Sequence, residues 1–365
     1  MPHKFIISGG GTGGHIFPAI AIANEIKARE KDADILFVGA NGRMEMDKVP
    51  AAGYQIRGLN ISGLKRSLSM SNLLVPMKLF GAIMDAGKIL KAFKPDAVIG
   101  VGGYASSAVL YSASRKRIPS LIQEQNSFPG ITNKLLSGRA GKICVAYPGM
   151  EKFFPADKLV LTGNPVRQEI ADLENKRQLA LEFFGLRPDK FTLLVIGGSL
   201  GARSINLAIA GNLKKFGERG IQLIWQTGSS FVQESRLAIQ EAGDNDMHAF
   251  EFIQRMDLAY SVADLVVSRA GAIAVSELCI VGKPAILVPY PHASEDHQTH
   301  NAMALVEKEA AMLIRDQDVG TQLGDTVLQL YSDPGKRDSL SKQIAALAQP
   351  YAARKIVDEI FKLIR

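Results

Sequence analysis

An apolar run that leads into a cluster of glycines occurs twice in the chain, once at the start of each half. Residues 5–8 (FIIS) precede the run 9–14 (GGGTGG), and residues 192–196 (TLLVI) precede the run 197–201 (GGSLG). In a sheet of parallel strands, such a turn presents backbone N–H groups and a helix N-terminus to phosphate. A tight turn without a ligand is the alternative. The repeat predicts two Rossmann-like domains, each with a loop for an anionic ligand.

Short β-rich runs alternate with helical stretches along both halves, which is typical of an α/β protein with parallel sheets covered by helices. The predicted strands are residues 5–7, 35–38, 97–99, 120–122 and 143–145, then 191–196, 221–225, 265–267, 285–288 and 312–314. Turn-forming residues at 163–165 (GNP) separate the two series. We therefore expect domains at residues 1–163 and 164–349, with a C-terminal helix at 350–365 that packs back on the first domain.

Composition excludes several classes of protein. A chain of 365 residues with 47% hydrophobic residues is long enough for about two domains. The two cysteines, Cys144 and Cys279, are too far apart in sequence to suggest a disulfide framework or a thiolate metal cluster, which favours a reducing cytoplasm. No apolar run reaches the roughly 20 residues that cross a bilayer, and the N-terminal residues lack a signal-peptide core. We expect a protein that is neither secreted nor integral to the membrane.

The net charge of +7 does not indicate a nucleic-acid partner, because aromatic residues make up only 7% and no basic recognition helix is evident. Between Lys65 and Lys94, six basic residues accompany a single acid, Asp85, and are interleaved with large apolar residues. This pattern favours a segment that rests on an anionic membrane surface. A core helix with a solvated basic rim is the alternative.

Two further strands of the first half are followed by residues that could bind a ligand. Gly102, Gly103 and Tyr104 come directly after one strand and could form a second backbone-lined wall, or simply a strand-to-helix turn. The run 123–126 (QEQN) ends the next strand with four hydrogen-bonding side chains, which suits sugar hydroxyls.

In the second half, the strand at 265–268 leads into a helix that carries Ser276 and Glu277. A carboxylate accepts two hydrogen bonds and could hold a ribose diol, although a solvated helix face is the simpler reading. Gln298 and Asn301 lie three residues apart on one face of a later helix, as ligands for hydroxyls or as a helix cap. A dinucleotide dehydrogenase would require an acid at the end of its second strand, and residues 37–41 contain none.

Three Asp-x-Asp pairs, at residues 32–34, 244–246 and 316–318, are candidates for binding a catalytic metal ion. All three lie in polar connecting segments and none adjoins a glycine loop. We therefore expect no catalytic metal and no cofactor.

Together these segments resemble the MurG family of bacterial cell-wall glycosyltransferases. The matching motifs are residues 9–15, 61–63, 102–104, 124–126, 163–167, 197–199 and 272–277, followed by Gln298 and Asn301. The resemblance implies the glycosyltransferase B fold, with two Rossmann-like domains facing across a cleft. It also implies an inverting, metal-independent transfer of N-acetylglucosamine from UDP-N-acetylglucosamine to the 4-hydroxyl of undecaprenyl-pyrophosphoryl-N-acetylmuramyl-pentapeptide. The resemblance further implies a peripheral protein on the cytoplasmic face of the inner membrane.

The resemblance also implies the binding residues. Uracil is expected against Ile253, ribose on Glu277, diphosphate near Ser199 and Arg167, and the sugar hydroxyls near Gln298. Other residues implied in substrate binding are Thr12, Gly13, Gly14 and Asn126 in the first domain, and Ala272, Ile273, Ala274, Val275 and Ser276 in the second. The acceptor pyrophosphate is expected at the first domain's glycine loops, including 102–104. Gln123 departs from the histidine frequent in the family, which puts an acid-base role there in doubt.

His15 follows the first glycine loop and is the candidate general base, because a helix N-terminus disfavours the imidazolium form. It could instead bind the acceptor phosphate or hold the loop, with Glu124 or another acid as the base. Two other classes remain open: a UDP-sugar epimerase of the same fold, and a non-catalytic UDP-sugar-binding subunit.

Overall fold

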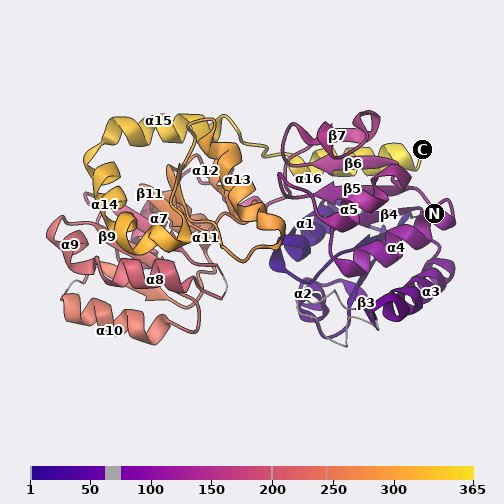
Figure 1. Cartoon of the computed structure of the whole chain (residues 1–365), viewed down its shortest axis with the longest axis horizontal. Coiled ribbons are helices and arrows are strands. Elements are labelled where there is room, and N and C mark those ends of the chain that lie inside the picture. The colour runs from indigo at the N-terminus through magenta and orange to yellow at the C-terminus, as the bar shows by residue number, and fades with distance from the viewer. Residues whose placement is uncertain (1, 62–74, 199, 244) are drawn as a thin grey trace. The chain divides into compact units, whose positions relative to one another are not determined.

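The computed structural model describes residues 2–61, 75–198, 200–243 and 245–365, which form two compact units (Figure 1). The first unit comprises Met1–Val166 and Pro350–Arg365, and the second comprises Arg167–Gln349. Each contains one sheet whose neighbouring strands all run parallel, so the α/β class expected from the sequence is confirmed. Ser199 and the basic apolar residues 65–74 lie outside the described residues.

The first unit contains a seven-stranded sheet with a reversal of strand order at its centre. Across the sheet, the strands are β3 (Gln55–Leu59), β2 (Asp34–Ala40), β1 (Lys4–Ser8), β4 (Ala97–Gly100), β5 (Ser120–Glu124), β6 (Lys142–Val145) and β7 (Leu159–Leu161). Its α-helices are α1 (Gly13–Arg29), α2 (Glu45–Ala51), α3 (Val75–Phe93), α4 (Tyr104–Arg115), α5 (Ile131–Leu136) and α16 (Ala352–Leu363).

Alternate residues of β1 belong to different cores on the two faces of this sheet. Phe5 and Ile7 pack with residues of α1 and α16, whereas Ile6 packs with residues of α3 and α4. Successive side chains of a strand point to opposite faces, so a strand covered on both sides must be apolar throughout. This explains why the central strands are recognisable as uninterrupted apolar runs.

The C-terminal helix α16 belongs to the first unit, where it lies beside α1 and β5 although it is distant from both in sequence (Figure 1). Ile356, Val357 and Ile360 are fully buried in the same core as Phe5 and Ile7. Their spacing places them on one stripe of the helix. Residues 350–365 therefore complete the core of the first unit.

The second unit repeats the architecture with a six-stranded sheet. Across the sheet, the strands are β10 (Met247–Phe250), β9 (Gln222–Gln226), β8 (Thr192–Ile196), β11 (Leu265–Ser268), β12 (Ala285–Leu287) and β13 (Met312–Leu313). Its α-helices are α6 (Gln168–Ala171), α7 (Arg177–Phe184), α8 (Arg203–Ala210), α9 (Leu213–Glu218), α10 (Val232–Ala242), α11 (Met256–Val262), α12 (Ala272–Val281), α13 (His297–Val306), α14 (Val319–Ser332) and α15 (Pro334–Ala345).

Three strands were not predicted from the sequence, namely β3, β7 and β10, and all three lie at the edge of a sheet. Most of their residues are partly or fully exposed. An edge strand is paired on one side only and needs no continuous apolar run. Such strands therefore carry a weaker sequence signal than the central ones.

The strand order reverses between β1 and β4 in the first unit and between β8 and β11 in the second. The loops that leave two such neighbouring strands run in opposite directions, which opens a crevice at the carboxyl edge of the sheet. Both glycine-rich runs directly follow a strand at this point, β1 or β8. The topology thus places each run where a parallel sheet binds ligands.

Replacing Ile360 with alanine should destabilise the first unit by about 2–5 kcal/mol, because it removes buried methyl groups and leaves a cavity beside α1. For a unit of this size, calorimetry should show a transition about 5–15 °C lower. Lys355→Ala, on the exposed side of α16, should change stability by no more than about 0.5 kcal/mol. Equal transitions for the two variants would contradict the role assigned to α16.

Candidate functional site

The first glycine loop leads into a helix N-terminus that carries no side-chain cap. Thr12 is the N-cap of α1 and has extended backbone angles, but its side chain does not cap a backbone N–H of the helix, and the first turn contains no acidic residue. The first N–H groups of a helix lack partners within the helix and carry a partial positive charge. The turn that contains Gly13 and Gly14 can therefore bind an anionic group.

A buried glutamate, Glu45 at the start of α2, lies beneath this loop. Its side chain is 1% exposed, and its two carboxyl oxygens accept hydrogen bonds from the backbone N–H of Gly11 (2.8 Å) and of Ala40 (3.0 Å). Glu45 was not predicted from the sequence, because no motif accompanies it and the exposed Asp47 lies two residues further on.

The loop after β4 lies directly against the first glycine loop. Gly102 and Gly103 have φ of 100° and 85°. A Cβ atom at Gly103 would lie 2.6 Å from the carbonyl oxygen of Gly10, and one at Gly102 would lie 2.8 Å from Nε2 of His15. The structure thus brings the predicted acceptor loop and the predicted base together, and Tyr104 begins α4 with 54% of its surface exposed.

His15 is held by the loop that it follows. Its Nδ1 lies 2.9 Å from the carbonyl oxygen of Gly10 and 3.4 Å from the hydroxyl of Thr12. A carbonyl oxygen only accepts, so the hydrogen bond to Gly10 requires the proton on Nδ1. In neutral imidazole, Nε2 then carries the lone pair, as a general base requires.

Glu124, the alternative base, is buried at the end of β5 with 2% of its surface exposed. One carboxyl oxygen accepts from the backbone N–H and the side chain of Asn126 (3.0 and 3.2 Å). The other accepts from Gly130 N–H (3.2 Å) and the Asn133 side chain (2.7 Å). Burial raises the pKa of Glu124, and these hydrogen bonds oppose the rise. With both oxygens engaged, the geometry favours a role in holding the loop that contains Asn126.

Gln123, at the position where the family often has histidine, is fully buried. Its side chain donates to Asn164 (2.9 Å) and accepts from Gln125, and Asn164 donates in turn to the backbone oxygen of Gln125 (2.9 Å). These amides join the end of β5 to the segment at 163–165, so Gln123 has a structural role.

In the second unit, Gln226 connects two segments predicted to contact the donor. Its side chain donates to the Gly198 carbonyl oxygen (3.0 Å) and accepts from the backbone N–H of Ile253 (2.9 Å). Ile253 is 3% exposed. Gln226 was not predicted from the sequence, because it ends an apolar strand with no accompanying motif. The role of Ile253 toward uracil stays a prediction.

Glu277, predicted to hold the ribose, is 5% exposed on α12. One carboxyl oxygen accepts from Arg167 (3.1 and 3.3 Å), and the other accepts from the hydroxyl of the buried Tyr260 (3.2 Å). Burial raises the pKa of Glu277, and Arg167 and Tyr260 oppose the rise. The structure thus unites two predicted donor residues, Arg167 and Glu277, and adds Tyr260, which reads as an ordinary core residue in the sequence.

The predicted donor residues at 272–276 form the first turns of α12. Gly271 is the N-cap, without a side-chain cap or an acid in the first turn. Val275 is 1% exposed, and the hydroxyl of Ser276 donates to the Ala272 carbonyl oxygen (2.9 Å). The parts of this segment that a ligand can contact include the partly exposed Ile273 and Ala274 and the helix N-terminus. This arrangement resembles that at the start of α1.

The two amides of α13 differ in their surroundings. Gln298, in the first turn, accepts from the backbone N–H of Tyr290 (2.9 Å) and is partly exposed. Asn301 is fully buried and donates to the Ala270 carbonyl oxygen (3.3 Å), so it joins α13 to the loop before α12. Gln298 is the better placed of the two for a sugar hydroxyl.

The aspartates of the Asp-x-Asp segments that the structure describes include three with cationic partners. Asp34 lies 3.8 Å from Lys4, Asp246 lies 2.5 Å from Lys190, and Asp316 lies 2.5 Å from Arg269. Within the described ranges, no three His, Cys, Asp or Glu side chains form a group that could hold a metal ion.

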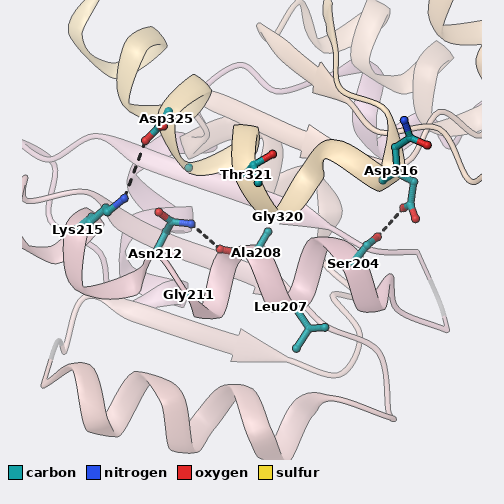
Figure 2. Close-up of a pocket in the computed structure, with 12 residues that line it drawn as sticks. Ser204, Leu207, Ala208, Gly211, Asn212, Lys215, Asp316, Gly320, Thr321 and Asp325 are labelled. Atoms are coloured by element: carbon teal, nitrogen blue, oxygen red, sulfur yellow. Dashed lines mark hydrogen bonds and ion pairs between the residues drawn. The ribbon is translucent and has the colours of Figure 1, made fainter.

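A separate pocket of about 500 Å³ lies along α8 and α14 of the second unit (Figure 2). Its polar lining includes Ser204, Asn212, Lys215, Asp316 and Asp325, and Figure 2 shows Ser204 donating to Asp316. It contains none of the residues predicted for donor or acceptor binding.

Among the described helices, none is long and apolar enough to cross a membrane.

Family models match both units of the chain. Residues 5–145 match the glycosyltransferase family 28 N-terminal domain, and residues 192–356 match the glycosyltransferase family 28 C-terminal domain. The crystal structure of Acinetobacter baumannii MurG is 30% identical, covers 99% of this chain and all of that chain, and superposes with a TM-score of 0.80. The predicted glycosyltransferase B fold is therefore confirmed.

Two curated relatives are more similar in sequence. Both are named UDP-N-acetylglucosamine–N-acetylmuramyl-(pentapeptide) pyrophosphoryl-undecaprenol N-acetylglucosamine transferase. The protein from Parabacteroides distasonis is 55% identical over 99% of this chain and 98% of its own length, and that from Cytophaga hutchinsonii is 52% identical over 100% and 97%. With such identity over essentially the whole length, the chain belongs to this family of N-acetylglucosamine transferases, the MurG family.

Proposed function

We propose that this chain transfers N-acetylglucosamine from UDP-N-acetylglucosamine to the 4-hydroxyl of undecaprenyl-pyrophosphoryl-N-acetylmuramyl-pentapeptide. The observation that carries the proposal is the presence, in each unit, of an uncapped helix N-terminus at the switch point of the sheet, α1 after β1 and α12 after β11. Both substrates contain a pyrophosphate group, and a helix N-terminus binds such anions. Membership of the MurG family supports this pair of substrates.

The second unit is proposed to hold the donor. Glu277 accepts hydrogen bonds from the ribose hydroxyls, the start of α12 and Arg167 bind the diphosphate, and Gln298 binds the sugar. Each oxygen of a carboxylate has two acceptor positions, so Glu277 can receive a ribose hydroxyl in addition to Arg167 or Tyr260. Arg167 has 40% of its side chain exposed and can therefore reach a ligand.

The reaction is proposed to be a single displacement with inversion. Nε2 of His15 accepts the proton of the acceptor hydroxyl as its oxygen attacks the anomeric carbon and UDP departs. The transition state then resembles an oxocarbenium ion. Backbone N–H groups and Arg167 stabilise the charge that develops on UDP, which makes a metal ion unnecessary.

The test of this function measures UDP release with the donor, with and without the lipid-linked muramyl acceptor, and in the presence of excess chelator. A transferase should release UDP at a rate that depends on the acceptor, and chelation should leave the rate largely unchanged. An epimerase would instead alter the sugar of the donor when the protein is incubated with the donor and no acceptor. A non-catalytic subunit would bind UDP and release none from the donor, and magnesium-dependent turnover would overturn the metal-free mechanism.

Glu277→Gln should weaken UDP binding by about 5- to 150-fold, equivalent to about 1–3 kcal/mol, because a neutral amide replaces a carboxylate that accepts from the ribose. Calorimetric titration with UDP measures the change. Glu182→Gln, at an exposed position of α7 in the same unit, is the control and should bind UDP as the unaltered chain does. Equal affinity of both variants would remove Glu277 from the donor site.

We further propose that the first unit binds the cytoplasmic face of the inner membrane through α3. Met77, Phe80 and Met84 lie on one side of this helix and are 72%, 67% and 53% exposed. Lys88 and Lys91, later in the helix, are also exposed. Exposed apolar side chains beside lysines suit insertion at the surface of an anionic membrane.

Replacing Met77, Phe80 and Met84 with serine should reduce sedimentation with liposomes of anionic lipid, because it removes the apolar contact with the acyl chains. Binding by the unaltered chain should fall as salt is added. The matched control replaces three exposed apolar residues of the second unit, Leu179, Phe183 and Leu237, with serine. If the control lost as much binding as the α3 variant, α3 would not be the membrane surface.

A further inference from the structure

We propose that Glu45 is a positioning residue for the transfer reaction, and that it acts on His15 through the single peptide group between Gly10 and Gly11. The proposal rests on the function proposed above, in which His15 is the base. Glu45 itself lies beneath the loop, 1% exposed, and contacts no substrate in this scheme.

The two hydrogen bonds involved are made by opposite ends of one peptide group. Glu45 accepts from the N–H of Gly11 at 2.8 Å, and the carbonyl oxygen of Gly10 lies 2.9 Å from Nδ1 of His15. Because Gly10 C=O and Gly11 N–H belong to the same amide plane, carboxyl group, peptide and imidazole form a continuous chain of hydrogen bonds.

Such a chain affects the imidazole electronically as well as sterically. A carboxylate that accepts from a peptide N–H polarises the amide, and its carbonyl oxygen becomes a stronger acceptor. The stronger acceptor holds the proton on Nδ1 of His15 and leaves the lone pair on Nε2. In a Ser-His-Asp triad a carboxylate fixes the histidine tautomer directly; here a peptide group lies between the two side chains.

Neighbouring groups pack closely against the glycines around this peptide, which leaves the peptide little freedom to rotate. A Cβ atom at Gly10 would lie 2.1 Å from Oε1 of Glu45, and one at Gly39 would lie 2.5 Å from its Cγ. On another side, a Cβ at Gly103 would lie 2.6 Å from the Gly10 carbonyl oxygen. A side chain at position 10 or 39 would therefore displace Glu45 from this position.

A role confined to stability makes a different prediction from a role in orienting His15. Glu45 begins α2, and Val49 of the same helix is 2% exposed in the core of the first unit. Val49→Ala should loosen α2 without altering the hydrogen-bond chain. Glu45→Gln keeps the side-chain shape but removes the negative charge. In one orientation its amide N–H faces Gly11 N–H and that hydrogen bond is lost, and in the other a neutral amide oxygen accepts from Gly11, so the charge-assisted hydrogen bond to Gly11 is removed in both.

The test is a double-mutant cycle on acceptor-dependent UDP release. Glu45→Gln should lower kcat by about 10- to 100-fold, the range found when a group that orients a metal-binding histidine is removed, with the donor KM within about twofold. His15→Gln should lower kcat by about 10²- to 10⁴-fold. Adding Glu45→Gln to His15→Gln should then change kcat by less than about threefold. Val49→Ala should lower the unfolding temperature and leave kcat within about threefold in either background.

The same factor for Glu45→Gln in both backgrounds, or near-native kcat in the single variant, would overturn the proposal. If Glu45→Gln does not fold, Glu45→Asp is taken through the same cycle, because its shorter carboxylate cannot reach both N–H groups.

A second measurement does not depend on turnover. Nitrogen-15 correlation spectra of histidine-labelled protein, with His15 assigned by its absence in His15→Gln, should show the Nδ1–H form in the unaltered chain. Glu45→Gln should show a mixture of tautomers. An unchanged tautomer would overturn the Glu45 proposal, whereas an unaltered chain that released no UDP with the acceptor would overturn the proposed function instead.

Discussion

The loops of this protein depend on buried carboxyl groups that need hydrogen-bond donors. Glu45, Glu124 and Glu277 are 1%, 2% and 5% exposed. Removing a carboxylate from water costs several kcal/mol unless donors replace the lost hydration. The donors come from Gly11 and Ala40 for Glu45, and from the segment 126–133 for Glu124. Glu45 and Glu124 therefore each hold a particular loop in one conformation.

Glycine loops gain from such support because they have little intrinsic order. A glycine-rich chain loses more conformational entropy on folding than other sequences, and no side chains of its own restrict it. In the first unit, Glu45 and the packing of Gly103 against Gly10 supply this restriction. The start of α1 can then present its N–H groups in a fixed direction, which electrostatic stabilisation of a charged group requires.

The elements that the sequence predicted well are those whose physics is local. Central strands such as β1 and β8 are buried on both faces and appear as apolar runs, and the glycine runs directly follow them. The edge strands β3, β7 and β10 were missed because half-exposed strands need no such pattern. Among the site residues, His15 could be located because it directly follows a glycine motif, whereas Glu45, Tyr260 and Gln226 could not, because their partners are distant in sequence.

The sequence by itself determined the two-fold repetition of a parallel sheet with a glycine loop, the positions of most strands, and, through its motifs, the family. These follow from periodicity and from residue types that backbone geometry demands within a few positions. Only the tertiary structure decided which donors each buried carboxyl group receives and which nitrogen of His15 bears the proton. Those outcomes depend on contacts between segments far apart in the chain, such as Arg167 with Glu277, and the approach of such segments is set by packing of the whole sheet.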